Sequence, residues 1–335
     1  ELLPKIGARF EDLCLIRSMT SKEGSHARAR YLVHTGYSPN PTVRHPSLGS
    51  ILADQIGAKD GELPAFVMIG GGGSALGAGY LGVDAAPFVV NDPRKPIQNL
   101  GYARGVDARR LDRRSELLGA LEASFAEKGG GEPVAANAAL LAKARRMMDS
   151  SKAKAFSVAG SDADLERYGN SEFGAGCLAA RQLIEAGVTA VEVNLNGWDT
   201  HDDNHNRVRK LSEVLDPAMA ALLDDLKHGG LLAETLVIWM GEFGRTPQLT
   251  SSDGRGHFTK SWCALLAGGG IRGAQVIGQT DERGENIVAR PVTVPDLFAT
   301  LAQLFRVDGS QIHYAGQRPI WLVDPEGKPV LEALA

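Results

Sequence analysis

The chain has 335 residues, of which 43% are hydrophobic and 23% charged, a balance typical of a globular protein with a sizeable core. Its net charge of −4 gives no electrostatic basis for binding nucleic acid or an anionic membrane, so neither is expected as a partner. No apolar run approaches the length of about 20 residues that a transmembrane helix needs, so no transmembrane segment is expected. The three cysteines, Cys14, Cys177 and Cys263, lie in apolar contexts and are predicted to be buried thiols.

The amino-terminal part of the chain predicts two strands and a short helix. An apolar run over residues 13–19 indicates a buried strand. A helix is predicted over residues 26–34, with Ser25 as its N-cap and Gly36 at its end. A second strand is predicted at 65–69. The glycine run 70–73 that follows lacks the lysine of a phosphate-binding loop, so it gives little support for a nucleotide site.

Residues 100–160 predict a helical insertion. Five arginines within it, Arg104, Arg109, Arg110, Arg113 and Arg114, alternate with Asp107 and Asp112. This alternation favours a solvated, salt-bridged helix face over a binding patch.

The second half of the chain alternates helices with apolar strands. Strands are predicted at 188–194, 235–240 and 262–267, and helices at 178–186, 208–226 and 296–305. This order predicts an α/β fold, a three-layer sandwich with a mostly parallel central sheet covered by helices on both faces.

Polar side chains that suit a divalent metal lie next to the predicted strands in the sequence. Asp199 and His201 come after strand 188–194, Glu242 follows strand 235–240, and His257 precedes strand 262–267. Because open α/β sheets place their sites at strand ends, these four residues are expected to share one site. Four ligands suffice for one metal, whether catalytic or structural.

Two further residues have more than one possible role. His26 lies in the first turn of its helix, at the positive end of the helix dipole, and can be a metal or anion ligand, a nucleophile that becomes a phosphohistidine, or a helix cap. Arg245 can hold a sulfate or phosphate group in a bidentate manner, or pair with a core carboxylate. Arg30 is a second candidate for the anion.

Residues 25–39 (SHARARYLVHTGYSP) resemble the sulfatase signature, in which a nucleophile begins a helix and an arginine follows four residues later. Aligned on Thr35 and Gly36, His26 falls at the nucleophile position and Arg30 at the arginine. Residues 295–301 (PDLFATL) resemble a helix near the end of sulfatases and phosphoglycerate mutases, which belong to the alkaline phosphatase superfamily.

A closer resemblance, over nearly the whole chain, is to the sulfatase-like bacterial family known as domain of unknown function 1501. It is carried by residues 16–19 (IRSM), 45–49 (HPSLG), 198–201 (WDTH), 240–247 (MGEFGRTP) and 267–271 (AGGGI). The resemblance implies one sulfatase-like domain over residues 1–335, whose first strand, with one or two metal-binding aspartates, would lie upstream of Glu1.

The superfamily resemblance also implies roles for the site. Asp199 and His201 would bind a first metal with His257 as its distal histidine, and Glu242 stands where the superfamily binds a second metal. The implied function is a metal-dependent hydrolase of sulfate or phosphate esters that uses Zn, Ca, Mg or Mn and His26, Arg30 and Arg245.

The implied substrate is a small-molecule or polysaccharide ester. The implied location is outside the cytoplasm, periplasmic or extracellular, although no signal peptide is visible in the sequence. The alternative is a catalytically degenerate binding protein that keeps the fold and at most one metal.

Overall fold

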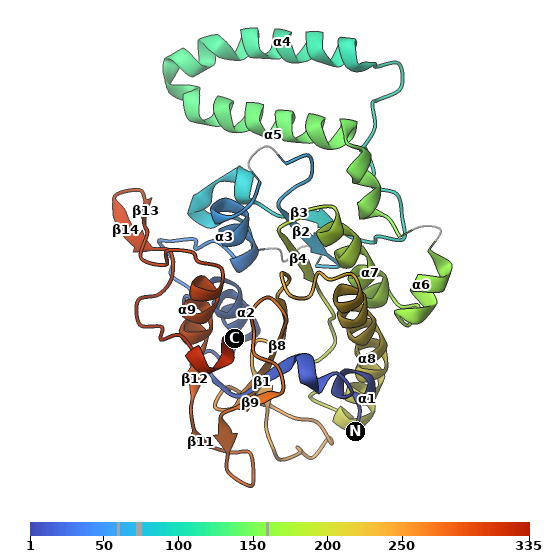
Figure 1. Cartoon of the computed structure of the whole chain (residues 1–335). Helices are drawn as coiled ribbons and strands as arrows, with labels where there is room; N and C mark the ends of the chain where they lie inside the picture. The colour runs from blue at the N-terminus through green and yellow to red at the C-terminus, as the bar shows by residue number, and fades with distance from the viewer. Residues whose placement is uncertain (59–60, 72–75, 159–160) are drawn as a thin grey trace.

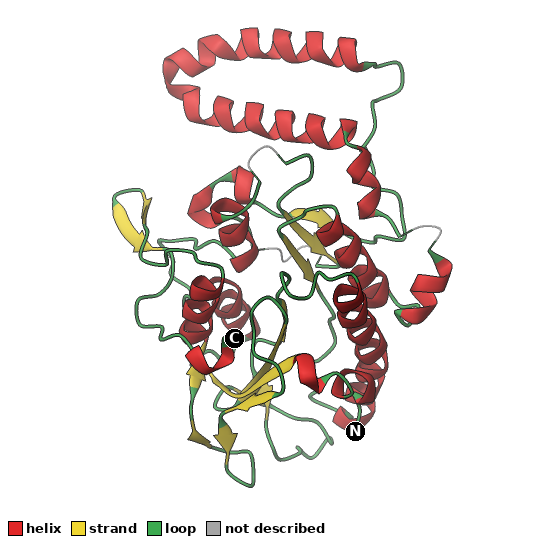
Figure 2. Cartoon of the chain, viewed as in Figure 1, coloured by secondary structure: helices red, strands yellow, loops and turns green. Residues whose placement is uncertain are grey.

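The computed structural model describes residues 1–58, 61–71, 76–158 and 161–335. It is a mixed α/β protein in which a five-stranded sheet and a three-stranded sheet lie among helices (Figures 1 and 2). Of the glycine run 70–73, Gly72 and Gly73 lie outside the described residues. Within the described part of the chain, no helix combines the length and apolar character that crossing a membrane requires.

The larger sheet has the strand order β12-β1-β8-β5, with β9 paired to β1. Its strands are β1 (Leu13–Thr20), β5 (Val237–Met240), β8 (Trp262–Ala267), β9 (Gln275–Ile277) and β12 (Val292–Thr293). β8 runs antiparallel to both β1 and β5, whereas β9 and β12 run parallel to β1. The mostly parallel sheet is therefore confirmed only in part. β8 follows β5 without a crossover helix, so the chain returns along the sheet in the opposite direction.

The smaller sheet is parallel throughout, in the order β3-β2-β4. Its strands are β2 (Phe66–Ile69), β3 (Phe88–Val90) and β4 (Ala190–Val193). β2 is fully buried, whereas every residue of β4 and β5 is half-buried. Among the described strands β4 pairs with β2 and β5 pairs with β8, so each has a strand neighbour on one edge.

Helices pack on both faces of the larger sheet, as the sequence predicts. Cys14 and Ile16 of β1 pack in a core with α2 (His26–Thr35) and α9 (Val294–Leu304). The alternate residues Leu13 and Leu15 pack in a second core with α8 (Asn204–His228) and Phe173 of α7 (Glu172–Glu185). α8 also packs against α7 in a third core, which contains β2 and the partly buried residues of β4. It therefore joins the two sheets on one face.

The predicted helix after β1 is confirmed as α2. Gly36 ends it with a φ of 77°, and a Cβ at this position would lie 2.9 Å from the Phe298 ring. Ser25 occupies the N-cap in an extended conformation, but its side chain makes no capping hydrogen bond. The first turn of α2 thus has no side-chain cap for its backbone N–H groups.

The predicted helical segment forms a hairpin of α4 (Ala108–Phe125) and α5 (Gly131–Asp149), followed by the 3-10 helix η5 (Ser151–Phe156). The hairpin stands away from the sheets at the top of Figure 1. None of the α4 residues is buried, and Asp112 pairs with Arg145 of α5 at 3.3 Å. These findings agree with a solvated, salt-bridged face.

Two of the three predictions for the cysteines hold. Cys14 and Cys177 are buried, but Cys263 is exposed. The adjacent residues Trp262 and Ala264 are buried, and the alternation of side chains along a strand places Cys263 on the opposite side from these two.

Candidate metal centre

Four segments that are distant in the sequence meet at one cluster of side chains. The loop after β4 brings Asp199 and His201, and the loop after β5 brings Glu242. His257 begins β7 (His257–Phe258), which pairs with β6 (Gly244–Arg245), and His26 begins α2. The structure therefore brings together all four residues predicted as metal ligands, with His26 beside them.

Two loops that lie back to back hold His201 in place. The Arg255 N–H donates to the Thr200 carbonyl at 2.9 Å, and the Asn204 N–H donates to the Asp253 carbonyl at 2.9 Å. A Cβ on Gly254 would lie 1.8 Å from the His201 carbonyl oxygen, so this close approach requires glycine.

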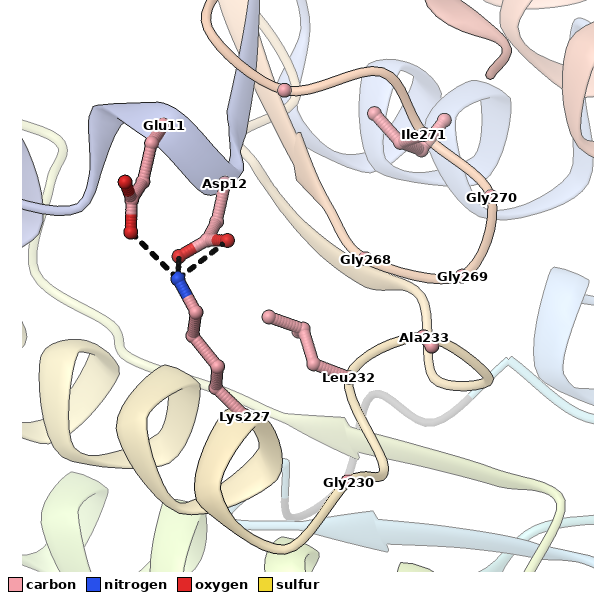
Figure 3. Close-up of a pocket in the computed structure, with 11 residues that line it drawn as sticks. Glu11, Asp12, Lys227, Gly230, Leu232, Ala233, Gly268, Gly269, Gly270 and Ile271 are labelled. Carbon is pink, nitrogen blue, oxygen red and sulfur yellow. Dashed lines mark hydrogen bonds and ion pairs between the residues drawn. The ribbon is translucent and has the colours of Figure 1, made fainter.

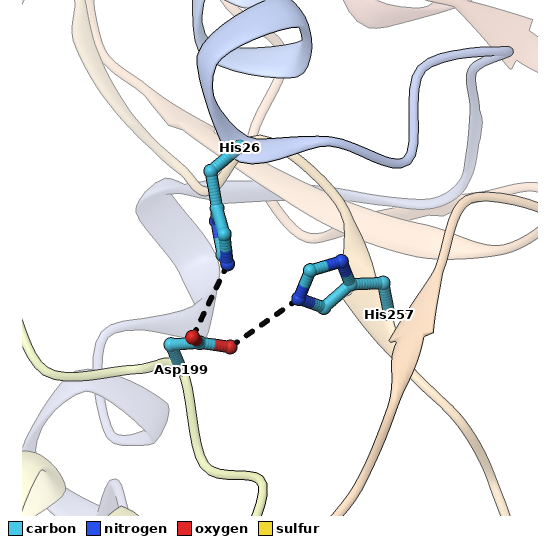
Figure 4. Close-up of side chains that lie close together, drawn as sticks. All are labelled: His26, Asp199 and His257. Carbon is cyan, nitrogen blue, oxygen red and sulfur yellow. Dashed lines mark ion pairs between the residues drawn. The ribbon is translucent and has the colours of Figure 1, made fainter.

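The Asp199 carboxylate lies between three imidazoles (Figure 4 shows two of them). Its Oδ1 is 3.0 Å from His201 Nε2 and 3.4 Å from His257 Nε2, and its Oδ2 is 3.3 Å from His26 Nε2. The Nε2 atoms of His201 and His257 are 3.1 Å apart.

These separations fit the first shell of one small divalent ion. Zinc binds imidazole nitrogen and carboxylate oxygen at about 2.0–2.2 Å, which puts neighbouring ligands of a tetrahedral site about 3.3 Å apart. One ligand atom each from His26, Asp199 and His257 lies within 4.8 Å of the other two. The residues present therefore fit a metal ion.

The outer nitrogens of two imidazoles are fixed by hydrogen bonds. His26 Nδ1 is 2.6 Å from Glu242 Oε1, and His257 Nδ1 is 2.7 Å from the Gly24 carbonyl oxygen. Because a carboxylate and a carbonyl only accept, each Nδ1 carries a proton, and in the neutral ring Nε2 keeps its lone pair. His26 Nε2 is buried and has no hydrogen-bond partner among the residues that the structure describes, as expected for an atom directed at a ligand position.

Arg245 pairs with the same carboxylate. Its Nη2 lies 2.6 Å from Asp199 Oδ1. Burial of Asp199 opposes its ionisation, but the hydrogen bond and charge of Arg245 outweigh burial and lower the pKa of Asp199 to about 2. The carboxylate is thus ionised at neutral pH, and beside the Arg245 contact its oxygens keep further lone pairs for a cation. In this structure Arg245 pairs with Asp199, a carboxylate of the cluster whose side chain is 46% exposed, and not with the core carboxylate of its second predicted role.

Arg30 lies one turn along α2 from His26. It is close enough to Glu192 of β4 and to His34 to act on both electrostatically.

Two groups near the cluster were not predicted from the sequence: the Gly24 carbonyl and Phe243, whose ring centroid is 4.5 Å from that of His257. Residue type cannot predict that a backbone carbonyl such as that of Gly24 accepts a hydrogen bond. Phe243 could have been found, because it directly follows the predicted ligand Glu242.

A pocket of about 460 Å³ lies elsewhere, beside the amino-terminal segment (Figure 3). There Lys227 Nζ donates to Glu11 and Asp12 at 2.6 and 2.8 Å. Packing explains the glycine at position 268 of its wall, since a Cβ on Gly268 would lie 2.3 Å from the Leu232 carbonyl oxygen. None of its lining residues belongs to the metal-type cluster, which consists of His26, Asp199, His201, Glu242 and His257.

The fold and the cluster define an α/β protein with a preformed candidate metal centre. Residues 1–334 match the family described as "Protein of unknown function (DUF1501)", and the chain belongs to this family. No curated protein matches the chain. Among solved structures it is similar to the PsFucS1 sulfatase from Pseudoalteromonas sp., with 13% identity and a TM-score of 0.43. That match covers 91% of this chain and 62% of the sulfatase, so the chain spans less than two thirds of the sulfatase.

Proposed function

We propose that this protein is a metal-dependent hydrolase of sulfate or phosphate esters with an alkaline phosphatase or sulfatase type of fold. The observation that carries the proposal is the spacing of the ligand atoms, with Asp199 Oδ1 3.0 Å from His201 Nε2 and 3.4 Å from His257 Nε2. These distances between imidazole nitrogens and a carboxylate oxygen suit ligands that share one bound cation.

The proposed ligands are His26, Asp199, His201 and His257. Three imidazoles and one carboxylate favour zinc over magnesium or calcium, which prefer oxygen ligands. Glu242 then acts by holding His26 through Nδ1 rather than by binding the metal itself. This arrangement favours His26 as a ligand over the alternatives of nucleophile and cap.

An anionic ester suits the surroundings of the cluster. The amino-terminal turn of α2 begins at His26 and offers backbone N–H groups and the positive end of the helix dipole. The Arg245 guanidinium adds a positive charge beside Asp199. A bound divalent cation would supply a Lewis acid beside the ester oxygen. The Asp199 carboxylate and the three imidazoles would hold that cation, and the α2 amides and Arg245 would orient the sulfate or phosphate group. Arg30, one turn further along α2, remains a candidate for gripping the same group.

The substrate class and the location are parts of the same proposal. A polysaccharide ester and a periplasmic or extracellular location rest on the likeness of the 25–39 segment to the sulfatase signature. No contact among the described residues bears on the substrate class or on the location.

The test combines metal content with turnover. Purified protein is analysed for bound metal, and hydrolysis of aryl sulfate and aryl phosphate is measured with and without added Zn²⁺ or Mn²⁺. Stoichiometric metal and metal-dependent turnover are expected, and both should be lost in Asp199→Asn and His257→Ala. His205→Ala is the matched control, because His205 is exposed and lies outside the cluster.

Folded protein that binds no metal and turns over neither ester would remove the proposal. Bound metal without turnover would favour the second candidate, a binding protein of this fold that keeps one metal. The cluster alone supports that candidate, since the same spacing holds a structural ion.

A further inference from the structure

A second pocket lies at the far end of α2 from the metal-type cluster. It has a volume of about 340 Å³ and opens between residues 37–45 and β14 (Arg318–Trp321). α2 has 10 residues, and at about 1.5 Å per residue it separates the pocket from His26 by roughly 15 Å. The pocket is therefore a different site from the candidate metal centre.

Aromatic rings form part of the pocket wall. Tyr37 donates a hydrogen bond from its hydroxyl to the Trp321 carbonyl at 2.7 Å, which ties the two sides of the pocket together. The Tyr37 ring stacks on His45, with 4.1 Å between ring centroids and 10° between planes. Trp321 lines the pocket and is 43% exposed. The hydrogen bond fixes the Trp321 backbone beside Tyr37, and the exposed Trp321 offers an apolar surface to solvent.

The polar groups of the pocket are also held in place. The Tyr31 hydroxyl accepts from the His45 backbone N–H at 2.8 Å and lies 2.9 Å from His45 Nδ1, so it holds both the backbone and the ring of His45. Burial, and then the nearby Arg318, lower the pKa of His45 to about 4. The imidazole is therefore neutral near pH 7.

The charged side chains of the pocket balance each other. Arg318 is anchored by a 3.0 Å hydrogen bond to Thr42 Oγ1, and the half-buried Asp324 accepts from the Glu326 N–H at 3.0 Å. One guanidinium, one carboxylate and a neutral imidazole give no net charge. Such a lining does not select a phosphate or sulfate ion, which would be repelled by Asp324.

We propose that this pocket binds a neutral saccharide unit. Sugar hydroxyls both donate and accept, so they can pair with the Asp324 carboxylate and the Arg318 guanidinium at once. The C–H face of a sugar ring matches the exposed ring of Trp321, and the pocket is of the size that small ligands occupy. The site is independent of the proposed ester hydrolysis, because it shares no residue with the metal-type cluster.

The test is calorimetric titration of the full chain with cellohexaose, laminarihexaose, xylohexaose and maltohexaose at millimolar concentration. At least one is expected to bind, and Trp321→Ala should weaken that binding by about tenfold or more, as expected for loss of a ring contact of at least about 1.4 kcal/mol. Asp324→Asn should weaken it as well. Tyr314→Ala is the control, because Tyr314 is 65% exposed on the same hairpin but does not line the pocket.

Three results would overturn the proposal. They are no binding of any of the four oligosaccharides, equal weakening by Trp321→Ala and Tyr314→Ala, and displacement of the bound sugar by inorganic phosphate. Stripping the protein of metal with a chelator should leave sugar binding unchanged. Failure of ester hydrolysis is therefore distinguishable from failure of this site.

Discussion

His26 Nδ1 and Glu242 Oε1 lie 2.6 Å apart and couple the start of α2 to the loop after β5. A histidine that donates through one nitrogen to a carboxylate presents the other nitrogen as a stronger and better oriented ligand. The pair therefore explains why His26 Nε2 is directed at Asp199, 3.3 Å away. In the proposed metal centre, Glu242 would orient His26 and would not bind the metal itself.

Replacement of Glu242 tests this role. Glu242→Ala is expected to weaken zinc binding by about 10–100-fold, the usual effect of losing a group that orients a ligand. Glu242→Gln should weaken it less, since the amide oxygen can still accept from Nδ1. Competition with a zinc-binding dye gives the affinities.

The exposed Glu234 provides the control for this measurement, as Glu234→Ala should leave zinc affinity unchanged. If Glu242→Gln costs as much as Glu242→Ala, Glu242 is a direct ligand, as the sequence resemblance implies. If neither variant differs from the control, the coupling of Glu242 to the site is refuted.

The ion pair between Asp199 and Arg245 predicts a change in titration. Burial raises the pKa of Asp199, but the hydrogen bond and charge of Arg245 together have the larger effect in the opposite direction, and the pKa is about 2. In metal-free Arg245→Gln the pKa of Asp199 should therefore rise to or above its ordinary value of 3.8. Carboxyl ¹³C chemical shifts followed against pH measure it, and an unchanged midpoint would contradict the assigned pair.

The ion pair between Asp199 and Arg245 also makes a pH-dependent contribution to the stability of the fold. Because the folded-state pKa of Asp199 is lowered, its ionised form stabilises the fold above the ordinary value of 3.8. That contribution is lost as the pH falls through the interval from 3.8 to about 2. It should be small, since the Asp199 side chain is 46% exposed.

The sequence identifies the members of the candidate centre because polar residues after apolar strands converge at strand ends. Asp199, His201 and Glu242 follow predicted strands that the structure contains, and His26 begins a predicted helix. The sequence could not predict which of these side chains face the proposed metal position and which groups hold them from behind. It depends on which imidazole nitrogen meets the Gly24 carbonyl or a carboxylate, and residue type does not encode that.

The sequence also could not predict that β8 runs antiparallel to its neighbours. An apolar run such as Trp262–Ala267 has the same pattern in a parallel or an antiparallel sheet. β8 is antiparallel to β5, with Val237 opposite Ala267. This direction depends on how the loop between β5 and β8 turns the chain. β3 (Phe88–Val90), only three residues long, was too short to produce a periodic signal.

Gly254 predicts a mutational effect on the loop that carries His201. In Gly254→Ala the new Cβ would meet the His201 carbonyl at 1.8 Å, so the two loops must separate. We expect a loss of about 1–3 kcal/mol in the free energy of unfolding, with weakened zinc binding. Urea unfolding and zinc titration measure the two effects.

A glycine with free space around it controls for the change in backbone entropy. Gly119 lies within α4 and has no atom within 4 Å of an added Cβ, so Gly119→Ala should leave stability unchanged or raise it by about 0.5–1 kcal/mol. Equal stability of the two variants would show that the His201 loop tolerates separation.

The ion pair between His34 of α2 and Glu192 of β4 predicts a pH-dependent contribution to stability. His34 Nε2 lies 3.2 Å from Glu192 Oε1, and both side chains are about four-fifths covered, at 21% and 23% exposed. Burial lowers the pKa of His34, but pairing with Glu192 outweighs burial and raises it. Burial also raises the pKa of Glu192, and pairing with His34 lowers it. The pair is therefore fully charged only between the two values.

Glu192→Gln should lower the free energy of unfolding by about 1–3 kcal/mol in mildly acidic buffer, where His34 is protonated in the wild type. The difference should shrink as the pH rises through the raised pKa of His34, because the neutral imidazole no longer gains from the carboxylate. Urea unfolding at several pH values measures it. Glu185→Gln removes the surface pair with Arg181 instead and should cost within about 0.5 kcal/mol at every pH. A Glu192→Gln deficit that does not change with pH would mean that packing, and not charge, joins α2 to β4.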